Sequence, residues 1–428
     1  MNILVIGNGF DLAHGLPTKY GDFLEFVKVI RQVIRIYNSE DSSEIKWGNI
    51  DPRIKALMKK DMEKTQDNLF SKEKIWKELV GENFWIEYFV QYYMFCGENW
   101  IDFESEIKKI VELLDSEMFE QEPKHKLDDT LNKESSTFFN NIYVKRAIEI
   151  STSSISTYRQ IRDKLKSDLN KLIRVLEIYL SDFVSNLECN IISPNIEEVM
   201  TYPFEYADGS IKTKISYVIS FNYTNTYKRI YFKDINIDNY IHYIHGRVDI
   251  DNEMENNNMV LGIDEFLHGD RKGKDIEFIA FKKYYQRICK ETGSKYKEWV
   301  NEIQRDYQIS ERTENDCDEM IKYSMRENDF EKAMKWLNIA QENHEKKVKK
   351  HNVYIFGHSL DATDKDILRD LILNENVDTT IFYRNQEQKE QQVANLVKVI
   401  GPDELIRRTG GSTKTIKFEL QRKMVEMT

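Results

Sequence analysis

Several features that mark other classes of protein are scarce in this chain. Its 428 residues include only 6 prolines and 4 cysteines, and no apolar run is long enough to cross a bilayer. The cysteines lie far apart and form no C-x-x-C pair, which argues against a disulfide scaffold and a thiolate zinc site. We therefore expect a soluble cytoplasmic protein with reduced thiols and no membrane partner. The cysteines are Cys96, Cys189, Cys289 and Cys317.

Basic residues are outnumbered as well. The chain has 62 Lys and Arg against 73 Asp and Glu, a formal net charge of -11. A chain this acidic is poorly suited to non-specific binding of a nucleic-acid backbone. Nucleic acid is therefore not an expected partner, although a local basic groove would be compatible with this charge.

The chain does have two alternating textures. Short apolar runs end in Gly, Asn or Asp, as strands that lead into functional loops do. Between them, apolar residues recur at intervals of three and four, the period of an amphipathic helix. The expected strands are 3–6, 215–223, 240–245, 259–263, 353–357 and 380–383, and helical patterns cover 23–34, 76–92 and 165–183.

These textures predict an α/β fold, with a Rossmann-like parallel sheet and large α-helical insertions. Apolar residues make up 40% of the chain, which is enough for a sheet core and separate helical cores. No strand is expected between 35 and 205. The predicted core comprises 1–34, 206–265 and 351–428, and the predicted helical insertions are 35–205 and 266–350.

Four expected strands end in residues suited to chemistry. Ligands of doubly wound sheets bind at the carboxyl ends of strands, so neighbouring strands would bring these four loops to one cleft. Glycines in such a loop let backbone N–H groups approach a phosphate. The loops contain Gly7-Asn8-Gly9-Phe10-Asp11, Asn222-Tyr223-Thr224, His245-Gly246 and Gly357-His358-Ser359.

Each loop has a plainer explanation when it is taken alone. The glycine loop fits a tight strand-to-helix turn, and Asn222 fits a turn cap. His245 fits a core histidine with a backbone partner, and Ser359 fits a helix N-cap. Leu12 stands in place of the third glycine of the dinucleotide fingerprint, so an ordinary dehydrogenase is not expected.

Taken together, the order G-x-G, Asn, His-Gly and G-x-S resembles the sirtuin-like NAD-binding fold. That group reads Gly-Ala-Gly-x-Ser followed by Gly-Ile-Pro, and this chain reads GNGFD at 7–11 followed by GLP at 15–17. Its catalytic-side motif is Gln-Asn-x-Asp or Asn-Tyr-Asp, and this chain has FNYT at 221–224. The resemblance implies a sirtuin-like sheet core.

Five short islands spread along nearly the whole chain carry a closer resemblance. They are GNGFDLAHGLPT at 7–18, NWIDFE at 99–104, SFNYT at 220–224, IHG at 244–246 and FGHSL at 356–360 with Asp364. These islands resemble the AbiH family of phage abortive-infection proteins. The family implies antiviral defence by growth arrest or death of the infected cell, and it does not settle the chemistry.

The sirtuin-like resemblance also implies a reaction, hydrolysis of NAD or a related nucleotide at the glycosidic bond. The leaving pyridinium departs neutral through an oxocarbenium-like transition state, so no metal is expected. His245 would be the general base, and Asn222 would hold the ribose or the attacking water. The implied nucleotide-binding residues are Gly7, Asn8, Gly9, Phe10, Asp11, Thr224, Gly246, Gly357, His358 and Ser359.

Three departures from the sirtuin-like pattern bear on this reaction. Thr224 replaces the usual acid, which puts recognition of the nicotinamide amide in question. Asp11 replaces the usual Ser, and an acid there repels a diphosphate unless it faces a ribose hydroxyl or a cation. The four-cysteine zinc module is absent, so dinucleotide hydrolysis is expected rather than protein deacylation.

Two other functions remain open at this point. One is a metal-dependent nuclease or phosphodiesterase, although no H-x-x-x-H or D-x-H spacing supports a preformed site. The other is a nucleotide-binding sensor without turnover. A toxic hydrolase should be restrained until infection, so the helical insertions are candidates for homo-oligomer contacts or for sensing a phage-derived trigger or partner. The metal candidates are His14, Asp22, His242, His245, Asp264 and His358.

A few acids and one lysine lie close to the islands. Asp102 and Glu104 fit the first turn of a helix, where acids favour the macrodipole. Asp264-Glu265 and Lys283-Tyr284 either line the cleft or lie at helix caps and on the surface.

Overall fold

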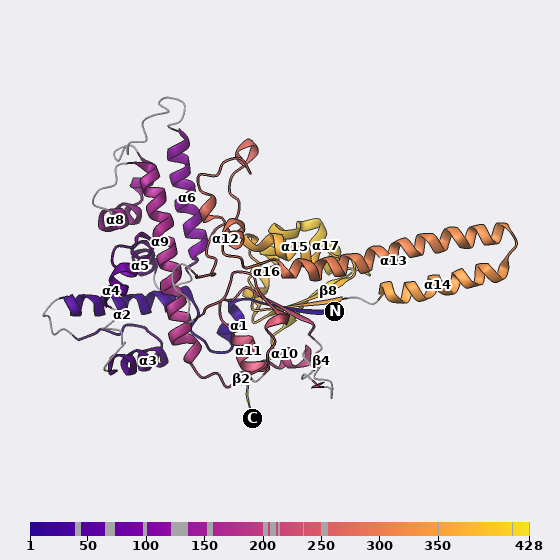
Figure 1. Cartoon of the computed structure of the whole chain (residues 1–428), viewed down its shortest axis with the longest axis horizontal. Helices are drawn as coiled ribbons and strands as arrows, with labels where there is room; N and C mark the ends of the chain where they lie inside the picture. The colour runs from indigo at the N-terminus through magenta and orange to yellow at the C-terminus, as the bar shows by residue number, and fades with distance from the viewer. Residues whose placement is uncertain are drawn as a thin grey trace.

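A computed structural model describes residues 1–38, 44–64, 73–96, 101–120, 136–151, 157–199, 204–205, 211–212, 215–233, 235–249, 256–348, 351–412 and 414–427. A sheet lies at the centre of the molecule (Figure 1). A block of helices lies on one side of it, and a long helical hairpin projects on the other side.

Six parallel strands form the central sheet. They are β1 (Asn2–Ile6), β5 (Tyr217–Ser220), β6 (Ile241–Tyr243), β7 (His351–Phe356), β8 (Val377–Tyr383) and β9 (Ile416–Leu420). Their order is β6-β5-β1-β7-β8-β9, with every pair parallel. Counted along the chain this is 3-2-1-4-5-6, the order of a doubly wound sheet. The sheet therefore changes its direction of growth between β1 and β7, where such sheets bind ligands.

Helices cover both faces of the sheet. They are α1 (Asn8–Ala13), α10 (Pro194–Val199), α11 (Thr226–Tyr231), α13 (Lys295–Arg326), α15 (Lys365–Ile372), α16 (Gln386–Ile400) and α17 (Pro402–Thr409). Ile3 and Val5 of β1 pack with the first turns of α13 and with α15, α16 and α17. Leu4 and Ile6 face the other way, toward α1, α10 and α11. Burial on both faces explains why β1 is continuously apolar.

The helices between β1 and β5 have an apolar core of their own, to which Phe26, Trp85 and Leu172 belong. The longest helix of this block, α9, begins at a capping box in which Thr157 and Gln160 bond each other's backbone. The helical elements are α2 (Tyr20–Asn38), α3 (Pro52–Met62), α4 (Glu73–Trp76), η1 (Lys77–Gly81), α5 (Phe84–Cys96), α6 (Phe103–Glu120), α7 (Thr137–Asn140), α8 (Ile142–Ser151), α9 (Tyr158–Ile178), η2 (Tyr179–Phe183) and η3 (Val184–Asn186).

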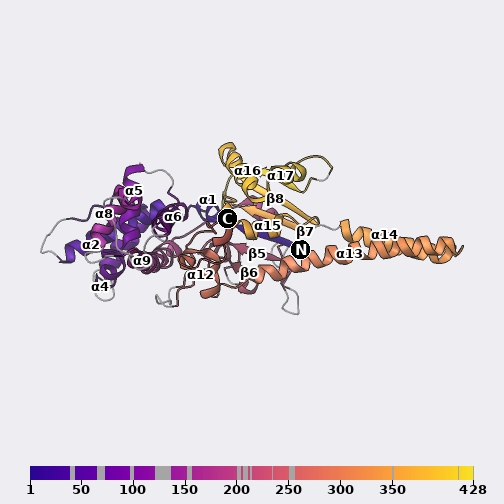
Figure 2. The same ribbon diagram turned by 90° about the horizontal axis from the view of Figure 1, so that it is seen from above.

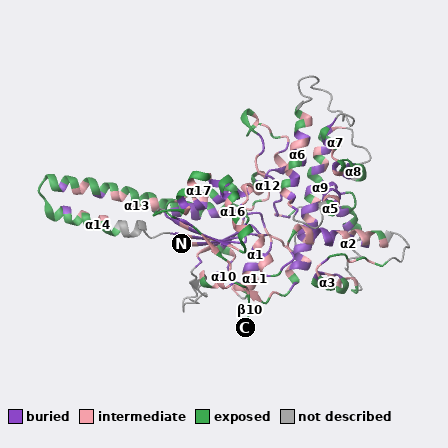
Figure 3. Cartoon of the chain, turned by 180° about the vertical axis from the view of Figure 1, so that it is seen from behind, coloured by how far each residue is buried: buried purple, intermediate pink, exposed green. Residues whose placement is uncertain are grey.

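A second helical segment separates β6 from β7. Its elements are η5 (Gly269–Arg271), η6 (Ile279–Phe281), α12 (Lys283–Cys289), α13 and α14 (Phe330–Val348). The hairpin of α13 and α14 extends away from the sheet in both views (Figures 1 and 2). It buries Cys317, Ser324 and Ala333, whereas most of its outer surface is exposed (Figure 3). The base of α13 is anchored by Trp299, whose ring stacks on Tyr217 at 4.2 Å.

The strand predictions at 3–6, 215–223, 240–245, 353–357 and 380–383 correspond to β1, β5, β6, β7 and β8. The prediction of a strand at 259–263 is wrong, because that segment joins no ladder. Its N–H groups bond elsewhere: Val260 donates to the carbonyl of His245, and Leu261 donates to the side chain of Gln286. A buried extended segment gives the same apolar run as a buried strand.

Some strands were not predicted. β9 was missed, and short strands lie between 35 and 205, where none was expected. Among the described residues the short pairs are β2 (Ile191–Ile192) with β10 (Val425–Glu426), and β3 (Phe204–Glu205) with β4 (Ile211–Lys212). The residue boundaries predicted for the core and the insertions stay a prediction. None of the helices in the described ranges combines the length and apolar character needed to cross a bilayer.

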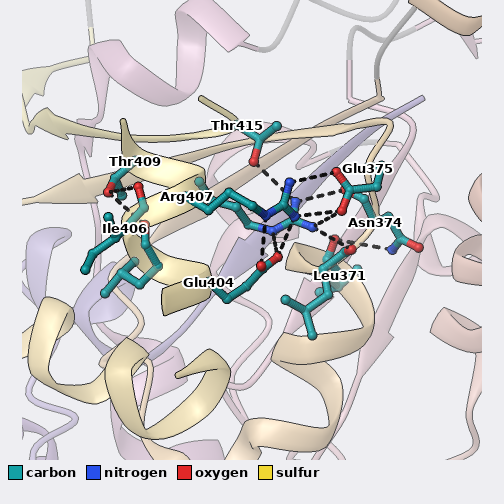
Figure 4. Close-up of polar contacts among 11 residues, drawn as sticks. Leu371, Asn374, Glu375, Glu404, Ile406, Arg407, Thr409 and Thr415 are labelled. Carbon is teal, nitrogen blue, oxygen red and sulfur yellow. Dashed lines mark hydrogen bonds and ion pairs between the residues drawn. The ribbon is translucent and has the colours of Figure 1, made fainter. Parts of the chain in front are cut away.

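A buried guanidinium fastens α17 to the end of α15. Arg408, 1% exposed, donates to the carbonyl oxygens of Leu373 and Asn374 at 2.8 and 3.2 Å. It also pairs with Glu375 and Glu404. Arg407 contacts the same two acids (Figure 4). A buried charge is tolerated when its donors are satisfied in this way.

Candidate active site at the strand ends

The predicted loops lie side by side at the carboxyl edge of the sheet. Pairing continues one residue past the strands: Phe221 N–H donates to the carbonyl of Ile6 at 2.9 Å, and Ile244 N–H donates to that of Ser220 at 2.9 Å. On the other side of β1, Gly7 N–H donates to the carbonyl of Phe356 at 3.2 Å. The loops after β6, β5, β1 and β7 are therefore neighbours, as the sequence predicted.

The glycines of two loops pack against each other at the point between β1 and β7. Gly9 N–H donates to the carbonyl of Gly357 at 2.7 Å. A Cβ on Gly9 would lie 2.7 Å from that same oxygen, and a Cβ on Gly357 would lie 2.1 Å from the nitrogen of Phe10. Gly357 also has φ +69°, which favours glycine. Close backbone approach therefore explains these two glycines without a ligand.

Asp11 is hydrogen-bonded to a hydroxyl group of the β5 loop. The hydroxyl of Thr224 donates to one carboxylate oxygen of Asp11, and Thr226 donates in turn to Thr224. The other oxygen of Asp11 is buried and has no hydrogen-bond partner. Burial raises the pKa of Asp11 to about 6, against the lowering effect of the two threonines.

Asn222 and His245 also carry buried polar atoms without hydrogen bonds. Both side-chain atoms of the Asn222 carboxamide lack a partner, although the group lies close enough to Asp11 to favour its ionised form. Nδ1 of His245 lacks one too. Asp11, Asn222 and His245 are 1%, 5% and 4% exposed. Buried polar atoms are normally satisfied, so four such atoms at three adjacent strand ends indicate a place for a polar ligand. We call Asp11, Asn222 and His245 the strand-end site.

Asp364 orients two histidines of the neighbouring loops. Nε2 of His245 lies 3.1 Å from Oδ1 of Asp364, and Nε2 of His358 lies 3.6 Å from Oδ2. Nδ1 of His358 accepts from the N–H of Leu360, so its proton is on Nε2. The carboxylate likewise favours the Nε2–H tautomer of His245, which leaves Nδ1 with a free lone pair. The ring of Phe221 packs edge-on against both imidazoles.

The helices between β1 and β5, which form the first helical segment, and the second helical segment each place a charged side chain near Asp364. Lys283 of α12 is 3% exposed, and its ammonium lies 2.8 Å from Glu104 of α6 and 3.0 Å from Asp364. It also donates to the hydroxyl of Thr363 at 3.2 Å. We call Glu104, Lys283 and Asp364 the buried ion network.

Burial and charge set opposite protonation tendencies in this cluster. Burial, assisted by the charge of Lys283, lowers the pKa of His245 to about 4, so the imidazole is neutral at pH 7. Burial raises the pKa of Glu104 to about 7, against the attraction of Lys283. Burial opposes ionisation of Asp364, but Lys283 and His245 outweigh it and hold its pKa well below the usual range. Perturbed groups of this kind are typical of functional sites.

Other predicted residues have identifiable places. Asn8 exchanges hydrogen bonds with Thr18, and Phe10 lies in the core against Phe356. Gly246 has φ +74° and touches the backbone of Asn258. The remaining residue, Ser359, is exposed on the β7 loop.

The metal candidates are mostly scattered. His14 bonds the carbonyl of Phe10 and the hydroxyl of Tyr231, and His242 bonds the carbonyl of Thr292. Of the six candidates only His245 and His358 share a partner. Among the described residues, no group of three or more His, Cys, Asp or Glu is arranged to hold a metal ion.

Sequence reasoning identified His245, Asn222 and Asp11 but not the buried ion network. The sequence favours a helix-terminal acid at Glu104 and leaves Lys283 either in the cleft or at a helix cap on the surface. Two members of the network belong to islands of the AbiH resemblance: Glu104 to the island at 99–104, and Asp364 to the last island. Membership of these islands is the sequence signal that could have identified the network. Residues 97–100 lie outside the described residues.

The chain matches the model of a known protein family. No curated protein and no solved structure matches the chain significantly. The profile of a family described as Bacteriophage abortive infection AbiH matches residues 3–384. That span covers most of the chain and contains the strand-end site and the buried ion network, so the protein belongs to the AbiH family.

Proposed function

We propose that this AbiH protein acts in abortive infection by hydrolysing NAD or a related nucleotide at its N-glycosidic bond. The proposed reaction takes place at the strand-end site. The observation that carries the proposal is the set of four buried polar atoms without partners on Asp11, Asn222 and His245.

The donor and acceptor character of these atoms favours a sugar. Asp11 offers a carboxylate oxygen, Asn222 offers a carbonyl oxygen and an N–H₂ donor, and neutral His245 offers the lone pair of Nδ1. Three acceptors against one donor group suit a ligand with several hydroxyl donors. A phosphate, which is an acceptor and an anion, suits this set poorly. A ribose with two adjacent hydroxyls suits it well.

The strand order is consistent with this ligand. Doubly wound sheets bind nucleotides where the strand order reverses, and here that point lies between the β1 and β7 loops. The same loops carry the sirtuin-like motifs. The proposal includes a sirtuin-like sheet core. It is supported by the strand order and by these motifs.

In the proposed reaction the bond between C1′ of the ribose and the pyridinium nitrogen breaks. Its electron pair passes to the nitrogen, so nicotinamide leaves neutral, and positive charge develops on the ribose. In this proposal the carboxylate of Asp11 stabilises that charge. A water attacks C1′ and gives its proton to Nδ1 of His245. The products are ADP-ribose, nicotinamide and a proton.

The test is incubation of the purified full-length protein with NAD, RNA and DNA, with and without EDTA. We expect release of nicotinamide from NAD in both conditions, and at least about 100-fold slower release by His245→Ala, the usual range for losing a general base. His242→Ala is the matched control, because it removes a buried imidazole from the same strand outside the site. Its thermal unfolding reports any general loss of structure.

Two outcomes would replace the proposal. Nucleic-acid cleavage that is lost in EDTA would favour a metal-dependent nuclease. Tight nucleotide binding without turnover would favour a sensor that signals through the helical segments.

A further inference from the structure

Lys283 is the residue through which the second helical segment contacts Asp364, the partner of His245. It is at the start of α12, directly after Lys282, and both lysines are almost fully buried. The two side chains diverge. Lys282 pairs with Glu265 at 2.9 Å, whereas Lys283 contacts Glu104 and Asp364. Burying a lysine costs free energy unless acids compensate it, and each has its own acid partner.

Glu104 belongs to the first helical segment and lies in the first turn of α6. Its carboxylate and that of Asp364 lie on the same ammonium, so Lys283 joins an acid of the first helical segment to an acid of the β7 loop. Asp364 in turn contacts Nε2 of His245. A continuous chain of polar contacts therefore connects both helical segments to the imidazole.

We propose that Lys283 and Glu104 are positioning residues, which hold Asp364 against His245 so that Nδ1 is the atom presented to the ligand. The inference adopts His245 as the base of the proposed function. It also makes the catalytic geometry depend on how both helical segments dock on the sheet. A shift of either segment would release Asp364 and misplace the imidazole.

The charges around His245 make this role measurable. Lys283 and Arg287 disfavour the imidazolium form, and Asp364 favours it. Arg287 is itself paired with Asp366, and His358 shares Asp364 with His245. If Asp364 is no longer held by Lys283, the imidazole loses the carboxylate that fixes its Nε2–H tautomer.

The experiment is a histidine titration by NMR in selectively labelled full-length protein, with the His245 signal assigned from its loss in His245→Asn. The unmodified protein should give the Nε2–H tautomer. In Lys283→Met/Glu104→Gln, which removes both side chains that hold Asp364, the Nε2–H form of His245 should give way to a mixture of the two neutral tautomers. Lys282→Met is the matched control and should keep the Nε2–H tautomer.

Glu104→Gln alone keeps the shape of the site and provides a second test if the double variant does not fold. It leaves the charge of Lys283 less compensated, so the pKa of His245 should stay low or fall. A rise there, or an unchanged Nε2–H tautomer of His245 in a folded double variant, would overturn the inference. If NAD is not hydrolysed but the titration behaves as expected, the proposed function fails and the positioning role stands.

Discussion

The carboxylate of Asp11 and the hydroxyl of Thr224 form a hydrogen bond across 213 positions of the chain. These are two of the positions at which the chain departs from the sirtuin-like motifs that it resembles, in which a hydroxyl is usual at the first position and an acid at the second. The pair therefore keeps one acid and one hydroxyl but exchanges their places. The carboxylate of Asp11 lies close to the carboxamide of Asn222.

Replacing Asp11 should change how stability depends on pH. Its pKa is about 6 in the folded protein, above the ordinary 3.8, so the unfolded chain ionises first as pH rises. Asp11 therefore contributes a loss of stability between about pH 4 and pH 6. Asp11→Asn should remove that loss, worth on the order of 3 kcal/mol for a shift of about two units. Urea unfolding at pH 4, 5, 6 and 7 measures it, and parallel curves for both proteins would contradict it.

The acid limb of the activity profile should lie unusually low. A free histidine base loses activity near pH 6.5, but burial lowers the pKa of His245 to about 4. Neutral imidazole therefore persists, and NAD turnover should hold as pH falls to about 5. The unfolded chain takes up this proton near pH 6.5, so His245 costs stability as pH falls from there to about 4. Initial rates from pH 4 to 8 decide the point, and a limb near 6.5 would show that His245 is not the base.

The strand ends could be predicted because their signals are local. Asn222 and His245 each follow a short buried run, and parallel strands place their ends at one edge. The same rule failed at 259–263, where an apolar run is buried without joining a ladder. An apolar run predicts that a segment is buried. It does not predict which groups the backbone of that segment hydrogen-bonds.

The buried ion network could not be predicted for a different reason. An acid at the position of Glu104 is favourable in any first turn of a helix, so the pattern does not separate a site residue from a cap. The contact of Lys283 with Glu104 depends on how two helical segments pack against each other. Short-range periodicity in the sequence does not predict that packing. Docking geometry of this kind becomes available only from the structure.

Removing the charge of Arg408 should strongly destabilise the C-terminal part of the sheet. Arg408→Met leaves the carbonyls of Leu373 and Asn374 without these donors, which costs about 1–3 kcal/mol for a buried acceptor, whereas Glu404 and Glu375 are partly exposed and keep Arg407 as a partner. Arg407→Met is the matched control, because Arg407 pairs with the same acids from a side chain that is 40% exposed. The loss of stability in Arg407→Met should be much smaller than in Arg408→Met. Equal losses in denaturant unfolding would mean that burial is not what makes Arg408 important.

The contact between the two glycine turns can be tested with a pair of alanine substitutions. Gly357 and Gly401 both have positive φ, so alanine is strained at either position. At Gly401 a Cβ would have nothing within 4 Å, whereas at Gly357 it would lie 2.1 Å from the nitrogen of Phe10 and 2.4 Å from the carbonyl carbon of Gly9. Those atoms are backbone and cannot rotate away.

Gly357→Ala should therefore lose more stability than Gly401→Ala, by about 1–3 kcal/mol, the usual cost of overpacking. Denaturant midpoints of the two variants give the difference directly. Gly357→Ala should also lose NAD turnover and Gly401→Ala should keep it, because only the first forces the β1 and β7 loops apart. Equal stability losses would mean that the two turns are not in contact, and the strand-end site would then lack the support that holds its loops together.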